Sequence, residues 1–124
     1  MSLAFCSRKL IQLAATASAL CLSGCNSSGD DPNSAYNRAL LEQGAQEKVK
    51  SILRDPVSAE FSGMIVRPLP EPGVGIVCGY VNSRNGFGGM SGPKRFVITP
   101  DLFQIEGQTP LADLLRTWGM VCNP

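Results

Sequence analysis

The sequence predicts an α+β domain: an N-terminal helix, a three- to four-stranded antiparallel sheet and a short C-terminal helix, closed by one disulfide. A helical spacing of apolar residues predicts the first helix, and short alternating apolar segments bounded by Gly and Pro predict the strands. A Thr-Pro pair before a final apolar stripe predicts the last helix. The 124 residues suffice for one domain. One helical layer on one face of a small sheet is the simplest packing.

The first helix is expected from Ala35 to Arg54, with Ser34 as its N-cap. Asp55-Pro56 ends it, because a residue before proline avoids the α region. Asp55 is expected to cap one further turn, Pro56 to Glu60, which directs Phe61 inward. The apolar stripe of the helix comprises Tyr36, Leu40, Leu41, Ala45, Val49, Ile52 and Leu53.

Three or four strands follow, expected at Phe61–Arg67, Val74–Asn82, Lys94–Thr99 and Leu102–Glu106. The second is apolar on both faces, which places it centrally in the sheet. Thr109 is expected to cap the last helix, with Pro110 at its first position and Gly119 as its stop. Its apolar stripe comprises Leu111, Leu114, Leu115 and Trp118.

The N-terminus has the three parts of a secretion signal. Arg8 and Lys9 precede an apolar run at 10–22, which is shorter than the roughly 20 residues of a membrane-spanning helix. Leu22-Ser23-Gly24-Cys25 then resembles the lipobox of bacterial lipoproteins. An ordinary cleaved signal with a chance cysteine is the alternative.

This resemblance implies cleavage of residues 1–24 and acylation of Cys25, including palmitate, so that lipid holds the chain to a membrane. The residue after the cysteine is Asn26, and in this the chain resembles lipoproteins that are sorted to the periplasmic face of the outer membrane. Residues 25–33 would be the lipidated cysteine and a polar tether, and residues 34–124 the α+β domain. The membrane is thus one expected partner and an envelope protein the other.

Two cysteines remain once Cys6 and Cys21 leave with the signal and Cys25 carries lipid. In an oxidising compartment, Cys78 and Cys122 are expected to form a disulfide. A metal or redox pair is the alternative, although the sequence lacks histidine and any Cys-x-x-Cys spacing.

The stretch 82–93 contains four glycines between two strands and is predicted to be a long hairpin loop. It fails the spacing of a P-loop and of a nucleophile elbow. It forms a candidate binding loop whose polar, cationic and aromatic residues are Asn82, Arg84, Asn85, Phe87, Lys94 and Arg95. Alternatively, the glycines serve turns of positive φ and the asparagines bond their own loop.

A second resemblance covers roughly residues 49–98. Asp55-Pro-Val-Ser-Ala-Glu-Phe61, then Val77-Cys-Gly-Tyr-Val-Asn-Ser-Arg-Asn-Gly-Phe-Gly-Gly89, then Phe96 resemble a pattern in small exported bacterial proteins. Met90 stands where that pattern has an aromatic residue. The resemblance implies a shared domain and no particular activity.

Composition narrows the function. Without Arg8 and Lys9 the chain carries 9 basic and 10 acidic residues, which gives no basic footprint for nucleic acid. The absence of histidine removes the commonest general base and metal ligand. We predict no catalytic residues, no metal and no cofactor. An enzyme stays as one hypothesis because two pairs of carboxylates could act as acid and base: Glu60 and Glu71, and Asp101 and Glu106.

The sequence therefore predicts a membrane-anchored bacterial envelope lipoprotein that is a non-enzymatic protein-binding or assembly-supporting module. The alternative is a small-ligand or enzyme-inhibitor module that uses loop 82–95.

Overall fold

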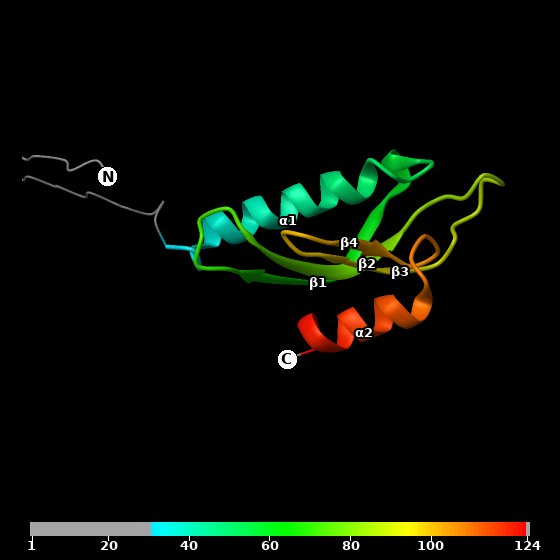
Figure 1. Cartoon of the computed structure of the whole chain (residues 1–124). Coiled ribbons are helices and arrows are strands. Elements are labelled where there is room, and N and C mark those ends of the chain that lie inside the picture. Colours follow the sequence, from blue (N-terminus) through cyan, green and yellow to red (C-terminus); the bar gives the residue numbers. More distant parts are fainter. Residues whose placement is uncertain (1–30, 124) are drawn as a thin grey trace, which may run out of the picture.

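The protein is represented by a computed structural model that describes residues 31–123. The elements are helix α1 (Ala35–Lys50), the 3₁₀ turn η1 (Pro56–Ser58), strands β1 (Glu60–Pro68), β2 (Gly75–Asn82), β3 (Lys94–Ile98) and β4 (Phe103–Ile105), and helix α2 (Leu111–Val121). The predicted α+β class and the order of helix, meander and helix are confirmed (Figure 1). The predicted signal, 1–24, and Cys25 lie outside the described residues.

The four strands form one sheet in the order β1-β2-β3-β4, and every neighbouring pair is antiparallel. The prediction that the second strand is central is confirmed. Cys78 in β2 lies between Ile65 of β1 and Val97 of β3 in the register. Because β2 has a neighbouring strand on each side and a helix on each face, its residues Val77, Cys78 and Val81 are buried.

The two helices cover opposite faces of the sheet, so the expectation of one helical layer on one face is wrong (Figure 1). Val77 and Phe96 pack with α1, whereas Cys78 and Val97 pack with α2. Successive side chains of a strand point to opposite faces. Strands that are apolar on both faces therefore need a helix on each.

Helix α1 begins as predicted, since the Ser34 hydroxyl accepts a hydrogen bond from Asn37 N at 3.2 Å. It ends at Lys50, four residues before the predicted Arg54. Ile52 and Leu53 follow it in a tight turn and still pack against the core. Consecutive residues of an α-helix point about 100° apart, so a helix does not favour directing both side chains at one core. The turn allows both to reach it.

The predicted apolar stripe of α1 is only partly the buried one. Ala45 and Val49 are buried, but Tyr36 is 63% exposed and Leu40 is 45% exposed. Asn37 occupies the buried side of the first turn instead. The helix therefore turns an apolar edge to solvent near its N-terminus.

Helix α2 differs from its prediction at both ends. Pro110 is the N-cap residue, and the Thr109 hydroxyl accepts a hydrogen bond from Ile105 N instead of capping the helix. Gly119 lies within the helix, which continues to Val121. Thr109 closes the turn after β4, so its oxygen is not available to α2.

The core under α2 is small and includes the predicted disulfide, which is confirmed between Cys78 and Cys122. Both cysteines are buried together with Val97 and Leu114. Leu111 and Leu115, predicted to lie on the apolar stripe, are exposed. The disulfide therefore links the end of α2 covalently to β2, at a place where few apolar contacts hold the helix against the sheet.

Candidate functional site

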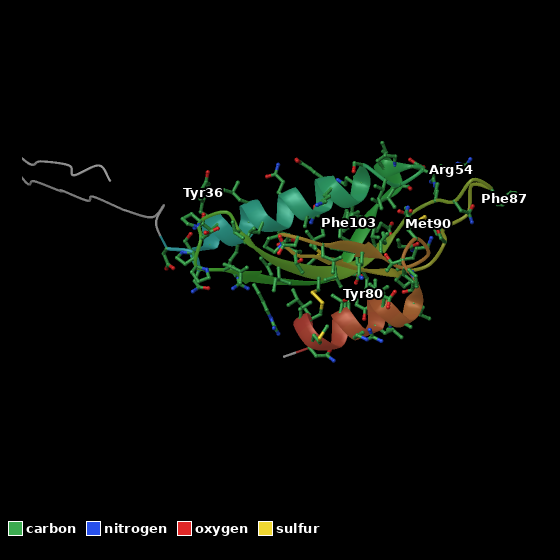
Figure 2. All side chains as sticks on the ribbon, viewed as in Figure 1. Tyr36, Arg54, Tyr80, Phe87, Met90 and Phe103 are labelled. Carbon is green, nitrogen blue, oxygen red and sulfur yellow. A yellow bond between two sulfur atoms is a disulfide. The ribbon has the colours of Figure 1, made fainter. Side chains whose placement is uncertain are left out.

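The glycine-rich hairpin projects from the end of the domain opposite the start of α1 (Figure 1). Phe87 lies at its tip and points away from the domain (Figure 2). Its side chain is 100% exposed. A fully exposed phenylalanine forgoes roughly 1.5–3 kcal/mol of burial free energy, so its position requires an explanation.

The loop tip is ordered by its own hydrogen bonds. Asn85 Oδ1 accepts from the backbone N–H of Phe87 at 2.9 Å and of Gly89 at 3.3 Å. The Asn85 N–H donates to the carbonyl of Gly89 at 2.8 Å. Gly88, at φ 83°, supplies the left-handed residue of this turn. Phe87 is thus presented on a defined backbone.

The base of the loop is held in the same way. Asn82 Oδ1 accepts from Gly92 N at 2.9 Å, and the Ser91 hydroxyl donates to the carbonyl of Ser83 at 2.8 Å. The side-chain oxygens of Asn82 and Asn85, two predicted binding residues, are therefore used to build the loop. The structural alternative describes them better than the binding prediction does.

Lys94 and Arg95 belong to β3 and not to the projecting loop. Arg95 forms an ion pair with Glu106 at 3.4 Å, and its guanidinium lies 5.7 Å from the ring centroid of Tyr80. Two of the six predicted binding residues, Arg84 and Phe87, are exposed on the loop itself. Within the described domain, their side chains form no hydrogen bond that holds the loop, and only their backbone N–H groups do so.

The turn η1 contacts the start of the loop, a contact that the sequence did not predict. The Ser58 hydroxyl accepts a hydrogen bond from Arg84 N at 2.9 Å. The Arg54 guanidinium lies so close to Gly86 that a Cβ built there would collide with it. Asp55 is the N-cap residue of η1 and Pro56 its first residue, as predicted, although the turn ends at Ser58 and not at Glu60. The Asp55 side chain forms no capping hydrogen bond, and its backbone carbonyl accepts from the Ser58 hydroxyl. The Asp-Pro-x-Ser motif therefore positions the loop.

These contacts bring five exposed residues to one end of the domain, with Val57 placed there by the neighbouring Ser58. We call them the loop tip surface: Arg54, Val57, Arg84, Phe87 and Met90. Val57 is 97% exposed and Met90 is 43% exposed. Arg84 and Met90 face each other across an isolated antiparallel bridge. Figure 2 shows Arg54, Phe87 and Met90 at the same end of the molecule. The surface combines apolar side chains with two guanidinium groups.

The carboxylate pairs considered for acid–base chemistry are not brought together. Glu60 pairs with Asn82 at one end of β1, whereas Glu71 lies in the connection at the other end. Asp101 precedes β4, and Glu106 follows it and pairs with Arg95. Among residues 31–123, His, Cys, Asp and Glu form no cluster of three or more that could hold a metal ion.

A second candidate site is a groove of about 430 Å³ beside α1. Leu40, Gly44 and Lys48 form one wall, and the turns at Gly73 and Pro100 form the other. It lies away from the loop tip surface, so the two are separate. No helix in the described part of the chain has the length and apolar character needed to span a membrane.

No family model, curated protein or solved structure matches this chain. The two resemblances drawn from the sequence therefore stay predictions.

Proposed function

We propose that this chain is a membrane-anchored bacterial envelope lipoprotein whose domain is a non-enzymatic protein-binding or assembly-supporting module. The lipobox-like Leu22-Ser23-Gly24-Cys25 supports lipid attachment at Cys25, and Asn26 supports the periplasmic face of the outer membrane. The loop tip surface is the part of the domain that we assign to the protein partner.

The observation that carries this proposal is Phe87, fully exposed on a hydrogen-bonded loop. Aromatic and arginine side chains dominate the binding free energy of protein interfaces when they enter a partner's pocket. A loop already fixed by Asn85 loses little conformational entropy on binding. Phe87 as the anchor and Arg84 at its rim thus have the properties of a protein-contact site.

Loop chemistry favours a protein partner over a small ligand. A small-molecule site is concave and directs several polar groups at its ligand. Here the loop projects outward, and the Asn82 and Asn85 oxygens are held by the loop's own amides. No cofactor is part of the proposed function.

In-cell photo-crosslinking tests the proposal. A photoreactive residue replaces Phe87 in one strain and Met120 in another; Met120 is the matched control because it is 67% exposed on α2. We expect a discrete protein adduct from position 87 and not from 120. With the photoreactive group at position 90, Phe87→Ala should lower the yield of the same adduct at least about tenfold, the loss of a minor hot spot. Met120→Ala should leave that yield unchanged. Identical adducts at 87 and 120, or an adduct insensitive to Phe87→Ala, would contradict the proposal.

A further inference from the structure

The opposite end of the domain has its own exposed apolar surface, formed by the first turns of α1. Tyr36 and Leu40 are four residues apart and therefore adjacent on one side of the helix. Tyr36 lies at the start of α1 and points away from the sheet (Figure 2). Leu40 also lines the groove beside α1.

The chain enters the domain beside these side chains, at a fixed point. The carbonyl of Asp31 accepts from Asn37 Nδ2 at 2.7 Å and from Ser34 N at 3.0 Å. Asn37 is the buried polar residue of α1 and is only 5% exposed. Asp31 to Asn33, assigned to the tether by sequence, thus form a bonded turn on the helix. The connection to Cys25 shortens to residues 26–30.

Chain length then limits how far this end can move from a lipidated Cys25. The six Cα–Cα steps from Cys25 to Asp31 span at most about 20 Å when fully extended. Helix α1 has 16 residues and is about 24 Å long, and the loop tip surface lies beyond its far end. The Tyr36 end is therefore the one that the anchor keeps near the bilayer.

The residue types at this end suit a bilayer surface. Within α1, residues 35–41 carry one charge, Arg38, whereas residues 42–50 carry two glutamates and two lysines. The acidic residue beside the first turn is Asp31, whose carboxylate accepts a hydrogen bond from Asn33 N at 2.8 Å. Tyrosine is enriched at membrane interfaces because its ring is apolar and its hydroxyl is polar. Leucine inserts among acyl chains at the surface of a bilayer.

We infer that the edge of α1 formed by Tyr36 and Leu40 rests on the lipid bilayer that holds Cys25, so that the loop tip surface is held away from it. This inference rests on the proposed lipid anchor. It assigns the exposed edge of α1 to a phospholipid surface and gives the domain a defined orientation.

Depth-dependent fluorescence quenching tests the inference on the mature, lipidated chain. The chain is reconstituted into vesicles of phosphatidylethanolamine and phosphatidylglycerol with brominated acyl chains. Tyr36→Trp is compared with Phe87→Trp, both in a Trp118→Phe background, because Trp118 is the sole tryptophan. Insertion of roughly 5–10 Å at the interface predicts at least about twofold stronger quenching at position 36 than at 87.

Three results would overturn the inference. Equal quenching at the two positions, or stronger quenching at 87, contradicts the orientation while leaving the anchor intact. A blue-shifted but unquenched signal at 36 that depends on protein concentration indicates a second copy of the chain on this surface. A chain that carries no acyl group and stays outside the vesicles overturns the anchor, and with it the proposed function.

A measurement on the unsubstituted chain guards against a variant that fails to fold. A phospholipid with a photoactivatable acyl chain is crosslinked to the lipidated protein in the same vesicles. We expect label in the tryptic peptide 39–48, which contains Leu40, and at least about threefold less in peptide 85–94, which contains Phe87. Label that is equal in both peptides, or confined to 85–94, would contradict the inference.

Discussion

The Cys78–Cys122 disulfide should contribute a large share of the domain's stability. It joins residues 44 apart in sequence. Closing a loop of this size in the unfolded chain corresponds to about 4 kcal/mol on the chain-entropy model. Domains of this size typically have unfolding free energies of about 5–15 kcal/mol. Loss of the cross-link should therefore leave the domain close to its unfolding threshold.

The perturbation is reduction of the Cys78–Cys122 disulfide, compared with the double substitution Cys78→Ala/Cys122→Ala. Reduction removes the cross-link and keeps both sulfur atoms, whereas the double variant also leaves a cavity in the core under α2. Urea unfolding, with and without reductant, measures the free energy of unfolding. We expect reduction to lower it by about 4 kcal/mol in the native chain and to have no effect on the double variant.

Leu114→Ala is the matched control because Leu114 is fully buried in the same cluster and carries no sulfur. It should cost about 2–5 kcal/mol with the disulfide intact, which measures the packing of this cluster separately from the cross-link. If reduction lowers the unfolding free energy of the native chain by less than about 1 kcal/mol, the cross-link does not constrain the unfolded chain as argued.

Other substitutions test the loop and the sheet. Phe87→Ala should change the unfolding free energy by less than about 0.5 kcal/mol in urea titrations, because the side chain has no contacts to lose; a larger loss would show that Phe87 is structural. Asn85→Ala should accelerate hydrogen exchange at the two loop amides that its side chain binds and cost about 1 kcal/mol, and unchanged exchange would contradict the assigned bonds. Gly79→Ala should cost about 1–3 kcal/mol, because a Cβ there would lie 2.7 Å from Met64 Sδ and 3.0 Å from the ring of Phe96, which is fully buried and cannot move away. Gly44→Ala, with open space around it, should stabilise the domain by about 0.5–1 kcal/mol, and thermal melts that rank these two variants otherwise would contradict the packing.

Sequence periodicity was sufficient for the strands and the fold class because alternation reports directly which face of a strand is buried. The apolar residues on both faces of β2 also contained the signal for a helix on each face, and the simplest packing model overlooked it. The end of α1 and the cap of α2 were mispredicted because tertiary contacts decided them. Ile52 and Leu53 pack against the core from a turn outside α1. The Thr109 hydroxyl accepts a hydrogen bond from Ile105 N of β4 and so does not cap α2.

The candidate site was found in the right segment but with only part of its residues. Glycine content located the loop, and the alternative role for Asn82 and Asn85 in bonding it was also anticipated. Arg54 was missed because its guanidinium reaches Gly86 from a distant part of the chain, and Val57 because it is placed here only through its neighbour Ser58. The Asp-Pro-Val-Ser motif was the available signal, since Ser58 binds Arg84 N directly.

Intact-mass spectrometry of the chain recovered from cell envelopes tests the central claim, a lipid-anchored module, most directly. We predict a chain that begins at Cys25, carries acyl chains on that residue, and lacks the two thiol hydrogens of Cys78 and Cys122. A chain that retains residues 1–24, or that begins at or near Cys25 without acyl mass, would contradict the account.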